Sequence, residues 1–264
     1  MKYVYVLTSS DNDFYYEQFF ISIVSLRLHN PQAYIVVLID SKTKESLVGK
    51  RAGYESYISE TIIITAPETF SQKEVSRWIK TSMKNYITGD FLYIDCDTVI
   101  AGNLDCEFPQ SVNIGAVLDT HVPLSTHHLA PYFKGQDKKL GFYSSFNTEL
   151  RYNGGVLFCR DTPQSEKFFS LWHSLWLFSK KNSIHQDMPA LNQANSELGG
   201  IVQKLDDEWN CQITFNGLPF LADSKIIHCF ATSIKLYNCP YIPASIPVLS
   251  YVKETGIISP YLME

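Results

Sequence analysis

The amino-acid sequence predicts an α/β fold with a mainly parallel central sheet flanked by helices. The first half of the chain alternates strand-like and helix-like segments with short connections, which is the pattern of strand–helix–strand units. The strand-like segments are continuous apolar runs rich in β-branched residues, as expected of strands covered on both faces. No repeat and no low-complexity tract divides the 264 residues, so we expect a single domain over residues 1–264.

The chain opens with a predicted strand over residues 2–8. Residues 15–28 follow with apolar side chains at helical spacing, and Pro31 ends that pattern. Residues 33–39 form a second apolar run. Strand, helix and strand therefore complete one unit.

The second unit is marked by a helix start signal. Ser71 and Glu74 have the spacing of a capping box, which predicts a helix from there to about residue 86. Short apolar runs over residues 61–64 and 91–94 provide the strands on either side of it.

Residues 119–148 interrupt this rhythm. They hold three of the seven histidines, several prolines and glycines, and no clear strand. A long irregular insertion in a compact domain is often a lid or a binding loop, so we expect a functional role for it. Regular structure resumes with predicted strands over residues 154–159, 201–205 and 225–228, a helix over residues 163–178 with Thr162 as N-cap, and a helix that begins near Asp187.

The composition excludes some classes of protein. Twenty-two basic against twenty-seven acidic side chains leave a net charge of −5, which gives no support for a nucleic-acid-binding protein or for a general attraction to anionic lipid. A local basic patch would still allow peripheral association with a membrane. No apolar run is long enough to span one, and the first residues resemble a strand more than a signal peptide. The six cysteines form no C-x-x-C pair, so we expect free thiols and a cytoplasmic protein.

Asp95 and Asp97 are the most informative residues. They follow the strand over residues 91–94 directly, and alternate positions in an extended backbone project to the same side. Two carboxylates at the carboxyl edge of a parallel sheet lie where open α/β folds bind ligands. Because they would repel each other, a divalent cation such as Mg²⁺ or Mn²⁺ is expected between them, with positions left for phosphate oxygens.

Two other interpretations would account for the same pair of acids. A D-x-D pair is short and common, and many such pairs are solvated loops. The same residues also fit the nucleophile motif of haloacid-dehalogenase-like phosphatases, with Asp95 phosphorylated and with Lys204, Asp206 and Asp207 as the later lysine and metal-binding acids. Against the phosphatase hypothesis, that motif normally ends the first strand of the core, and the glycine that usually follows it is missing here.

Four further stretches accompany the carboxylate pair. Residues 151–158 match an F-N-x-G-V-L segment, residues 185–187 match a D-Q-D segment with histidine in the first place, and residues 226–228 form a strand ending in histidine. Residues 8–15 hold an acidic–aromatic turn after the first strand. Together, from Val4 to about Lys235, these stretches resemble glycosyltransferase family 8, a retaining family with the GT-A fold.

The resemblance implies a role for each matching residue. Residues 1–118 would bind the nucleotide and the metal, and residues 119–264 the donor sugar and the acceptor. Thr8, Asp13 and Tyr15 would contact the nucleotide, and Arg77 and Lys235 the donor and its diphosphate. Asp95, Asp97 and His228 would bind Mn²⁺, or Mg²⁺, with Asp95 also near the nucleotide. Asn153 would lie beside the donor sugar or the acceptor, Gln186 near the anomeric carbon, and Asp187 on the sugar hydroxyls. The implied donor is a UDP-hexose.

Plainer roles remain open for the same residues. Arg77 would be a solvated helix residue, Asn153 a turn residue, Asp187 a helix N-cap and His228 a buried core histidine. The chain also departs from the family pattern: Ala231 stands where a glycine is expected, and Lys235 falls one residue late. A protein that binds nucleotide-sugars without turnover is therefore a further alternative.

The expected reaction is transfer of the sugar to an acceptor that is a lipid-linked glycan, a protein or a free sugar. Retention of configuration allows a covalent intermediate or front-face attack assisted by the leaving phosphate. Gln186 near the centre favours front-face attack, because an amide is a weak nucleophile.

Overall fold

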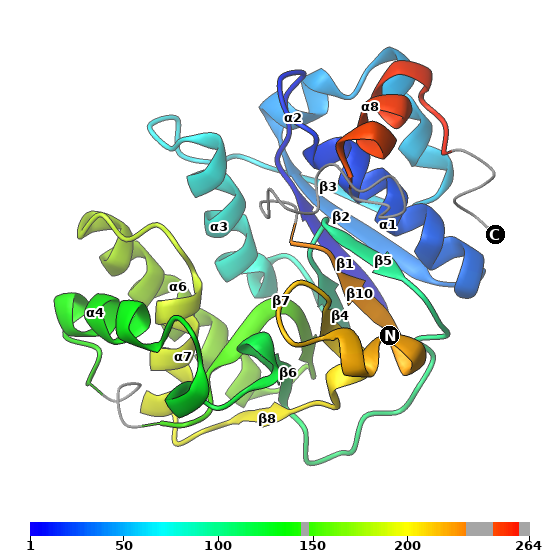
Figure 1. Ribbon diagram of the computed structural model, residues 1–264. Helices are drawn as coiled ribbons and strands as arrows, with labels where there is room; N and C mark the ends of the chain where they lie inside the picture. The colour runs from blue at the N-terminus through cyan, green and yellow to red at the C-terminus, as the bar shows by residue number, and fades with distance from the viewer. Residues whose placement is uncertain (144–147, 231–244, 259–264) are drawn as a thin grey trace.

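The chain forms a seven-stranded sheet covered by helices on both faces, as seen in a computed structural model that describes residues 1–143, 148–230 and 245–258 (Figure 1). The order of its strands is β3-β2-β1-β4-β7-β6-β8. The strands are β1 (Lys2–Leu7), β2 (Tyr34–Asp40), β3 (Glu60–Ile64), β4 (Phe91–Ile94), β6 (Ile114–Leu118), β7 (Tyr152–Cys159) and β8 (Val202–Lys204). The helices are α1 (Tyr15–His29), α2 (Ser41–Ser46), α3 (Gln72–Ser82), α4 (Ala130–Leu140), α6 (Pro163–Lys181), α7 (Met188–Glu197) and α8 (Ile246–Thr255).

The sheet is mostly parallel. The pairs β1–β2, β2–β3, β1–β4 and β6–β8 run parallel, whereas β7 runs antiparallel to both of its neighbours, β4 and β6. The predicted α/β fold with a mainly parallel sheet is therefore confirmed.

Each face of the sheet packs into its own apolar core. Tyr5 of β1 points into a core shared with α1 and α8, and Val6 points into a core shared with α3, α6 and α7. Figure 1 shows α1 and α8 on one side of the sheet and α3, α6 and α7 on the other. Both faces are covered, which explains why the strand segments are continuous apolar runs instead of alternating ones.

The helix ends follow the sequence signals. Ser71 and Glu74 form the predicted capping box, in which the Ser71 hydroxyl accepts from the Glu74 N–H and the Glu74 carboxylate accepts from the Ser71 N–H. The Thr162 side chain accepts a hydrogen bond from Ser165 N–H at the start of α6, as predicted. α6 ends at Lys181, three residues later than expected.

A second sheet of three strands was not expected. Its order is β5 (Thr98–Ile100), β10 (Ile226–His228) and β9 (Cys211–Gln212). The strand expected over residues 225–228, among those that close the core, is thus β10 of this small sheet and begins one residue later, at Ile226. β10 is antiparallel to β5, which begins directly after Asp97. This pairing places His228, from the second half of the chain, next to the carboxylate pair.

Residues 119–148, expected as a long irregular insertion, contain a regular helix in their middle part. α4 occupies Ala130–Leu140, with Pro131 in its first turn and Gly141 in the left-handed conformation at its C-cap. Gly135 and the three lysines interrupt the apolar pattern of this helix, so the spacing of apolar residues did not predict it.

None of the helices in the described part of the chain combines the length and the apolar character that a membrane span requires.

Candidate metal and donor site

Three predicted metal ligands converge at the ends of β4 and β10. Asp95 and Asp97 follow β4, and His228 is the last residue of β10, opposite Thr98 in the antiparallel pairing with β5. One ligand atom from each residue lies within 4.8 Å of the other two. Nε2 of His228 lies 3.2 Å from a carboxylate oxygen of Asp97.

Backbone hydrogen bonds hold the two acids in place. Asp95 N–H donates to the carbonyl of Gly155 on β7 at 2.7 Å, and Cys229 N–H donates to the carbonyl of Asp97 at 2.9 Å. The main chain therefore fixes the positions of the carboxylates from both sides, so that a ligand at this point meets a preformed arrangement.

The electrostatics of the cluster suit a cation. The His228 ring is buried; burial disfavours its protonated form, but the neighbouring carboxylates of Asp97 and Asp95 outweigh this and raise its pKa above 6.5. A divalent cation would replace the proton as the balancing positive charge. Two carboxylate oxygens and an imidazole nitrogen form a donor set that suits Mn²⁺ better than Mg²⁺. The residues present therefore fit a metal.

Lys80 is a site residue that no sequence motif marked. Its ammonium group lies 3.2 Å from Asp95 Oδ1 and 3.2 Å from Asp187 Oδ2, and its side chain is 8% exposed. Burial alone would lower its pKa, but Asp187 and Asp95 raise it, so Lys80 stays protonated. Tyr93 also donates a hydrogen bond to Asp95. The sequence feature that could have marked Lys80 is its position one turn after Arg77 on α3, because residues three apart face the same side of a helix.

Asp187, at the start of α7, is linked to this cluster through its ion pair with Lys80. It occupies the N-cap position of α7, yet its side chain makes no capping hydrogen bond. Instead it pairs with Lys80 and lies 4.0 Å from Nε of the partly exposed Arg77. Burial would raise the pKa of Asp187, but Lys80 and Arg77 lower it below 3.8, so the carboxylate is ionised at neutral pH.

The chain around Asp187 is anchored by two buried tryptophans of α6. Trp172 donates its indole N–H to the Asp187 carbonyl at 3.0 Å, and Trp176 donates to the His185 carbonyl at 3.1 Å. Gln186, between these two anchors, is exposed. Its amide contacts α4: Gln136 donates to it at 3.3 Å, and it donates to the Tyr132 hydroxyl at 3.4 Å.

Asn153 lies behind the metal ligands. Its side chain is buried, and both ends of the amide bond protein groups: Nδ2 donates to Asp119, while Oδ1 accepts from Gly155 N–H and from Asn210. Asn210, which no sequence motif marked, in turn bonds His228. Asn153 is thus linked to His228 through Asn210, and its predicted contact with the donor sugar or the acceptor stays a prediction.

The predicted nucleotide loop is tightly organised. The Asp13 carboxylate accepts hydrogen bonds from Ser9, Ser10, the Tyr15 N–H and the Gln72 amide, and these bonds lower its pKa although burial opposes the shift. Gln72 also donates to the Thr8 carbonyl, which ties the loop to the start of α3.

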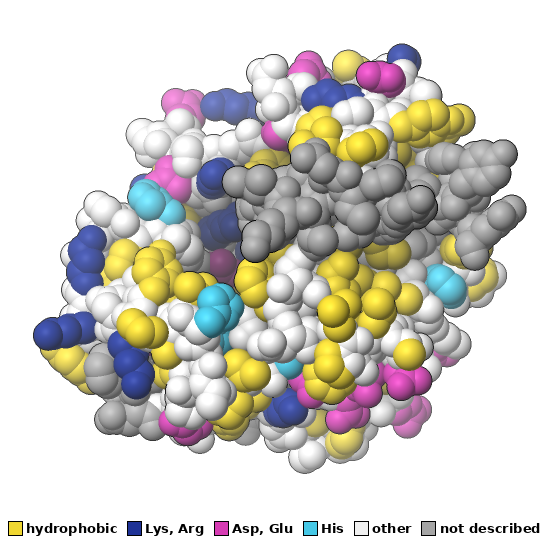
Figure 2. Space-filling view, in the orientation of Figure 1, with side chains coloured by type: hydrophobic (Ala, Val, Ile, Leu, Met, Phe, Trp, Pro, Cys, Tyr) yellow, Lys and Arg dark blue, Asp and Glu magenta, His cyan; other side chains and the backbone are white. Residues whose placement is uncertain are grey.

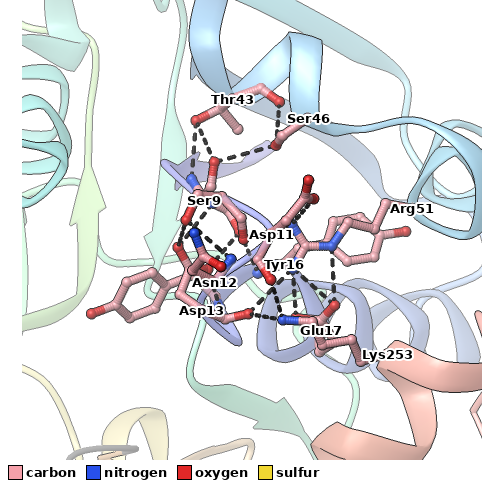
Figure 3. A network of polar contacts seen from close by, with 12 residues as sticks. Ser9, Asp11, Asn12, Asp13, Tyr16, Glu17, Thr43, Ser46, Arg51 and Lys253 are labelled. Carbon is pink, nitrogen blue, oxygen red and sulfur yellow. Dashed lines mark hydrogen bonds and ion pairs between the residues drawn. The ribbon is translucent and has the colours of Figure 1, made fainter.

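Buried charges brace the same loop from its other side (Figure 3). The Arg51 guanidinium pairs with the fully buried Glu17 and donates to the carbonyls of Ser10 and Asp13. Lys253 of α8 donates to the Asp13 carbonyl at 2.9 Å. These contacts stabilise the observed conformation of the loop.

Charged side chains gather in a hollow beside α3. Figure 2 shows this hollow near the middle of the face, with basic and acidic side chains at its depth. Lys235 and Ala231, at the predicted diphosphate contact, lie outside the described residues.

The phosphatase arrangement is not assembled. Lys204 and Asp207 form an ion pair with each other at 3.2 Å, and Asp207 also pairs with His121 at 2.8 Å. Within the described residues, the cluster of possible metal ligands around Asp95 contains Asp97 and His228 but neither Asp206 nor Asp207.

Comparison with solved structures identifies the fold. The chain is similar to the galactosyltransferase LgtC in complex with donor and acceptor sugar analogues, with a TM-score of 0.64 at 15% identity over 100% of this chain and 99% of that one. It is also similar to mouse xyloside xylosyltransferase 1, with a TM-score of 0.54 at 14% identity over 86% of this chain and 96% of that one. The glycosyltransferase GlyE of Streptococcus pneumoniae gives a TM-score of 0.56 at 15% identity over 98% of this chain and 61% of that one. The fold is of the GT-A type.

At these identities the likeness establishes the fold alone. No protein-family model and no curated protein sequence matches the chain. Activity therefore has to be argued from the site.

Proposed function

We propose that this chain is a metal-dependent glycosyltransferase that moves a hexose from a UDP-sugar to an acceptor with retention of configuration. The observation that carries the proposal is the convergence of Asp95, Asp97 and His228 at the carboxyl end of β4, in a fold of the GT-A type. Transferases of galactose and xylose among the structures with this fold support a sugar-transfer reaction.

The three ligands would hold Mn²⁺, which when bound neutralises charge on the leaving diphosphate. The Asp13 loop, with Thr8 and Tyr15, would hold the nucleotide, and its network of internal hydrogen bonds supports a preformed contact surface. Lys235 is proposed as a further contact of the diphosphate.

The Lys80–Asp187 pair is proposed to orient the donor sugar. Its carboxylate would accept hydrogen bonds from sugar hydroxyls, while Lys80 and Arg77 add positive charge beside the phosphates. Lys80 is buried, Asp187 is largely buried, and Trp172 of α6 holds the Asp187 carbonyl, so little reorganisation would accompany binding.

Transfer would proceed by front-face attack. The bond between the anomeric carbon and the phosphate oxygen breaks, the acceptor oxygen bonds to the same face of that carbon, and the acceptor proton passes to the leaving phosphate. Gln186 is proposed near the anomeric carbon, where its amide would stabilise the charged sugar by hydrogen bonding but form no covalent bond.

We propose α4 as the side from which the acceptor enters. Tyr132 and Gln136 of α4 hydrogen-bond Gln186, which is the neighbour of Asp187 in the chain. An aromatic ring that is half exposed and two amides that can donate and accept give a surface suited to sugar hydroxyls and ring faces. A saccharide, free or lipid-linked, is therefore the proposed acceptor.

The proposal is tested by incubating the protein with Mn²⁺ and a panel of nucleotide-sugars, with and without oligosaccharide acceptors, while release of the nucleoside diphosphate is measured. Asp97→Asn should abolish release, whereas Glu166→Gln, at an exposed position on α6, should leave it unchanged. Equal release by Asp97→Asn and the unmodified protein would refute the proposal. Metal-dependent binding without release would favour a binding protein instead.

A further inference from the structure

A chain of buried hydrogen bonds connects a backbone N–H on β7 to the ring of His228. It passes from Gly155 through Asn153 and Asn210 to Nδ1 of His228. We propose that Asn210 is a positioning residue: it fixes the tautomer of His228 so that the proton stays on Nδ1 and Nε2 is free for the metal. This inference rests on the proposed metal site and adds a residue that no motif marked.

The Gly155 N–H sets the direction of this chain of hydrogen bonds. A backbone N–H can only donate, so the amide atom of Asn153 that lies 2.8 Å from Gly155 N is its oxygen. The nitrogen of the same amide then faces Asp119 Oδ1 at 2.8 Å, where a carboxylate accepts it. The two contacts agree, and they fix the orientation of Asn153 without any assumption about its amide.

The orientation of the Asn153 amide fixes that of Asn210, and Asn210 in turn fixes which nitrogen of His228 carries the proton. The Asn153 oxygen lies 3.0 Å from the Asn210 amide, and since an oxygen cannot donate here, the Asn210 atom facing it is the nitrogen. The Asn210 oxygen therefore faces His228 Nδ1 at 2.9 Å. Only a protonated Nδ1 can donate to that oxygen. The other ring nitrogen, Nε2, faces the carboxylate cluster.

The hydrogen bonds on the other side of Asn153, which lead through Asp119 to His127, are fixed in the same way. Asp119 also lies 3.0 Å from Nε2 of His127, whose Nδ1 accepts the Leu129 N–H at 3.0 Å. His127 thus carries its proton on Nε2, the tautomer opposite to that of His228. The Leu129 N–H thus fixes the donors and acceptors at the His127 end, and the Gly155 N–H fixes them at Asn153, from which the chain continues to His228.

Burial makes the arrangement rigid. Asn210 is fully buried, and Asn153 and His228 are less than 9% exposed, so water does not compete for these bonds. A partner that holds the second nitrogen of a metal-ligating histidine orients the ring and strengthens the ligand, and its loss typically lowers metal affinity by roughly 10–100-fold.

Replacement of Asn210 tests the inference through metal binding, measured by calorimetry with Mn²⁺ alone. Asn210→Leu should raise the Kd by roughly 10–100-fold. Asn210→Asp keeps an acceptor for Nδ1–H but brings its second carboxylate oxygen against the Asn153 oxygen, so it should restore the affinity only in part. Asn195→Leu is the matched control, because Asn195 is also buried and bonds Val202 N–H at 2.8 Å away from the cluster. It should destabilise the protein without changing the Kd. An unchanged Kd in folded Asn210→Leu would overturn the inference.

A second measurement uses the unmodified protein and needs no metal. Nitrogen-15 NMR of labelled histidine at alkaline pH should show the neutral His228 ring protonated at Nδ1, against the preference of free histidine for Nε2. A proton on Nε2 would overturn the inference and leave the proposed function standing. Conversely, Nδ1 protonation together with Mn²⁺ binding that Asp97→Asn does not weaken would refute the proposed metal site while the tautomer assignment holds.

Discussion

Gly155 leaves the space that the ring of His228 occupies. A Cβ atom at position 155 would lie 2.3 Å from Cε1 and 2.7 Å from Nδ1 of His228, and 2.9 Å from the Asn153 oxygen. No real Cβ contact is that short, and β7 and β10 hold both backbones. The glycine is therefore required by the approach of the ring to the strand, not by its backbone conformation.

Gly155→Ala should displace the His228 ring and weaken Mn²⁺ binding by at least about tenfold, as for other losses of ligand orientation. Overpacking should also lower the free energy of unfolding by about 1–3 kcal/mol. Calorimetry and urea denaturation measure the two effects. Gly135→Ala is the control, because a Cβ there meets no atom within 4 Å and the helix gains about 0.5–1 kcal/mol. Full Mn²⁺ affinity in Gly155→Ala would show that the ring is not a ligand.

Lys80→Met should leave Asp95 and Asp187 without their shared cation. Breaking a buried pair typically costs about 3–5 kcal/mol, so a large loss of stability and of transfer activity is expected. Lys84→Met is the control: its partner Asp161 is 39% exposed, and loss of such a pair should cost about 1 kcal/mol or less. Urea denaturation and donor turnover give the readouts. Similar costs for the two variants would contradict the assigned role of Lys80.

Mn²⁺ binding should weaken as the pH falls. The metal requires an unprotonated Nε2, and the neighbouring carboxylates raise the pKa of His228 above 6.5 in spite of burial. Below that raised pKa, protons compete with the cation, and the apparent Kd should rise by up to about tenfold per pH unit. His29→Gln, at an exposed position, should show the same profile. A Kd that does not change between neutral and mildly acidic pH would exclude His228 from the site.

Tyr132→Ala should raise the KM for a saccharide acceptor several-fold and leave the KM for the donor unchanged, because the ring lies on α4 beside Gln186. Tyr143→Ala removes a more exposed tyrosine just beyond the C-cap of α4 and should alter neither constant. Steady-state kinetics with each substrate varied in turn separates the effects. An increase in the donor KM alone would move the acceptor site away from α4.

Much of the fold and the metal cluster could be predicted from the sequence because their signals are local. The apolar runs of β1, β2 and β4, and the capping box at Ser71, each lie within a few neighbouring residues. His228 is predicted beside Asp97 only through the family resemblance, because residues 226–228 alone indicate no more than a strand that ends in histidine.

The remainder depends on contacts between distant segments. Asn210 and Lys80 acquire their roles only when η5 (Asp207–Asn210) approaches β10 and α3 approaches β4, and neither residue lies in a recognisable motif. β5, β9 and β10 are two or three residues long, too short for periodicity to mark them as a second sheet. α4 could not be predicted because Gly135 and three lysines weaken its apolar face.

Asp95, Asp97 and His228 are proposed to bind one divalent cation that in turn binds a nucleoside diphosphate, and every other role assigned to the site depends on this. Calorimetric titration with UDP, with and without Mn²⁺, tests it most directly on the unmodified protein and on Asp97→Asn. We expect binding only when Mn²⁺ is present, and none to Asp97→Asn under either condition. UDP binding of equal strength without metal, or undiminished in Asp97→Asn, would contradict the proposed site.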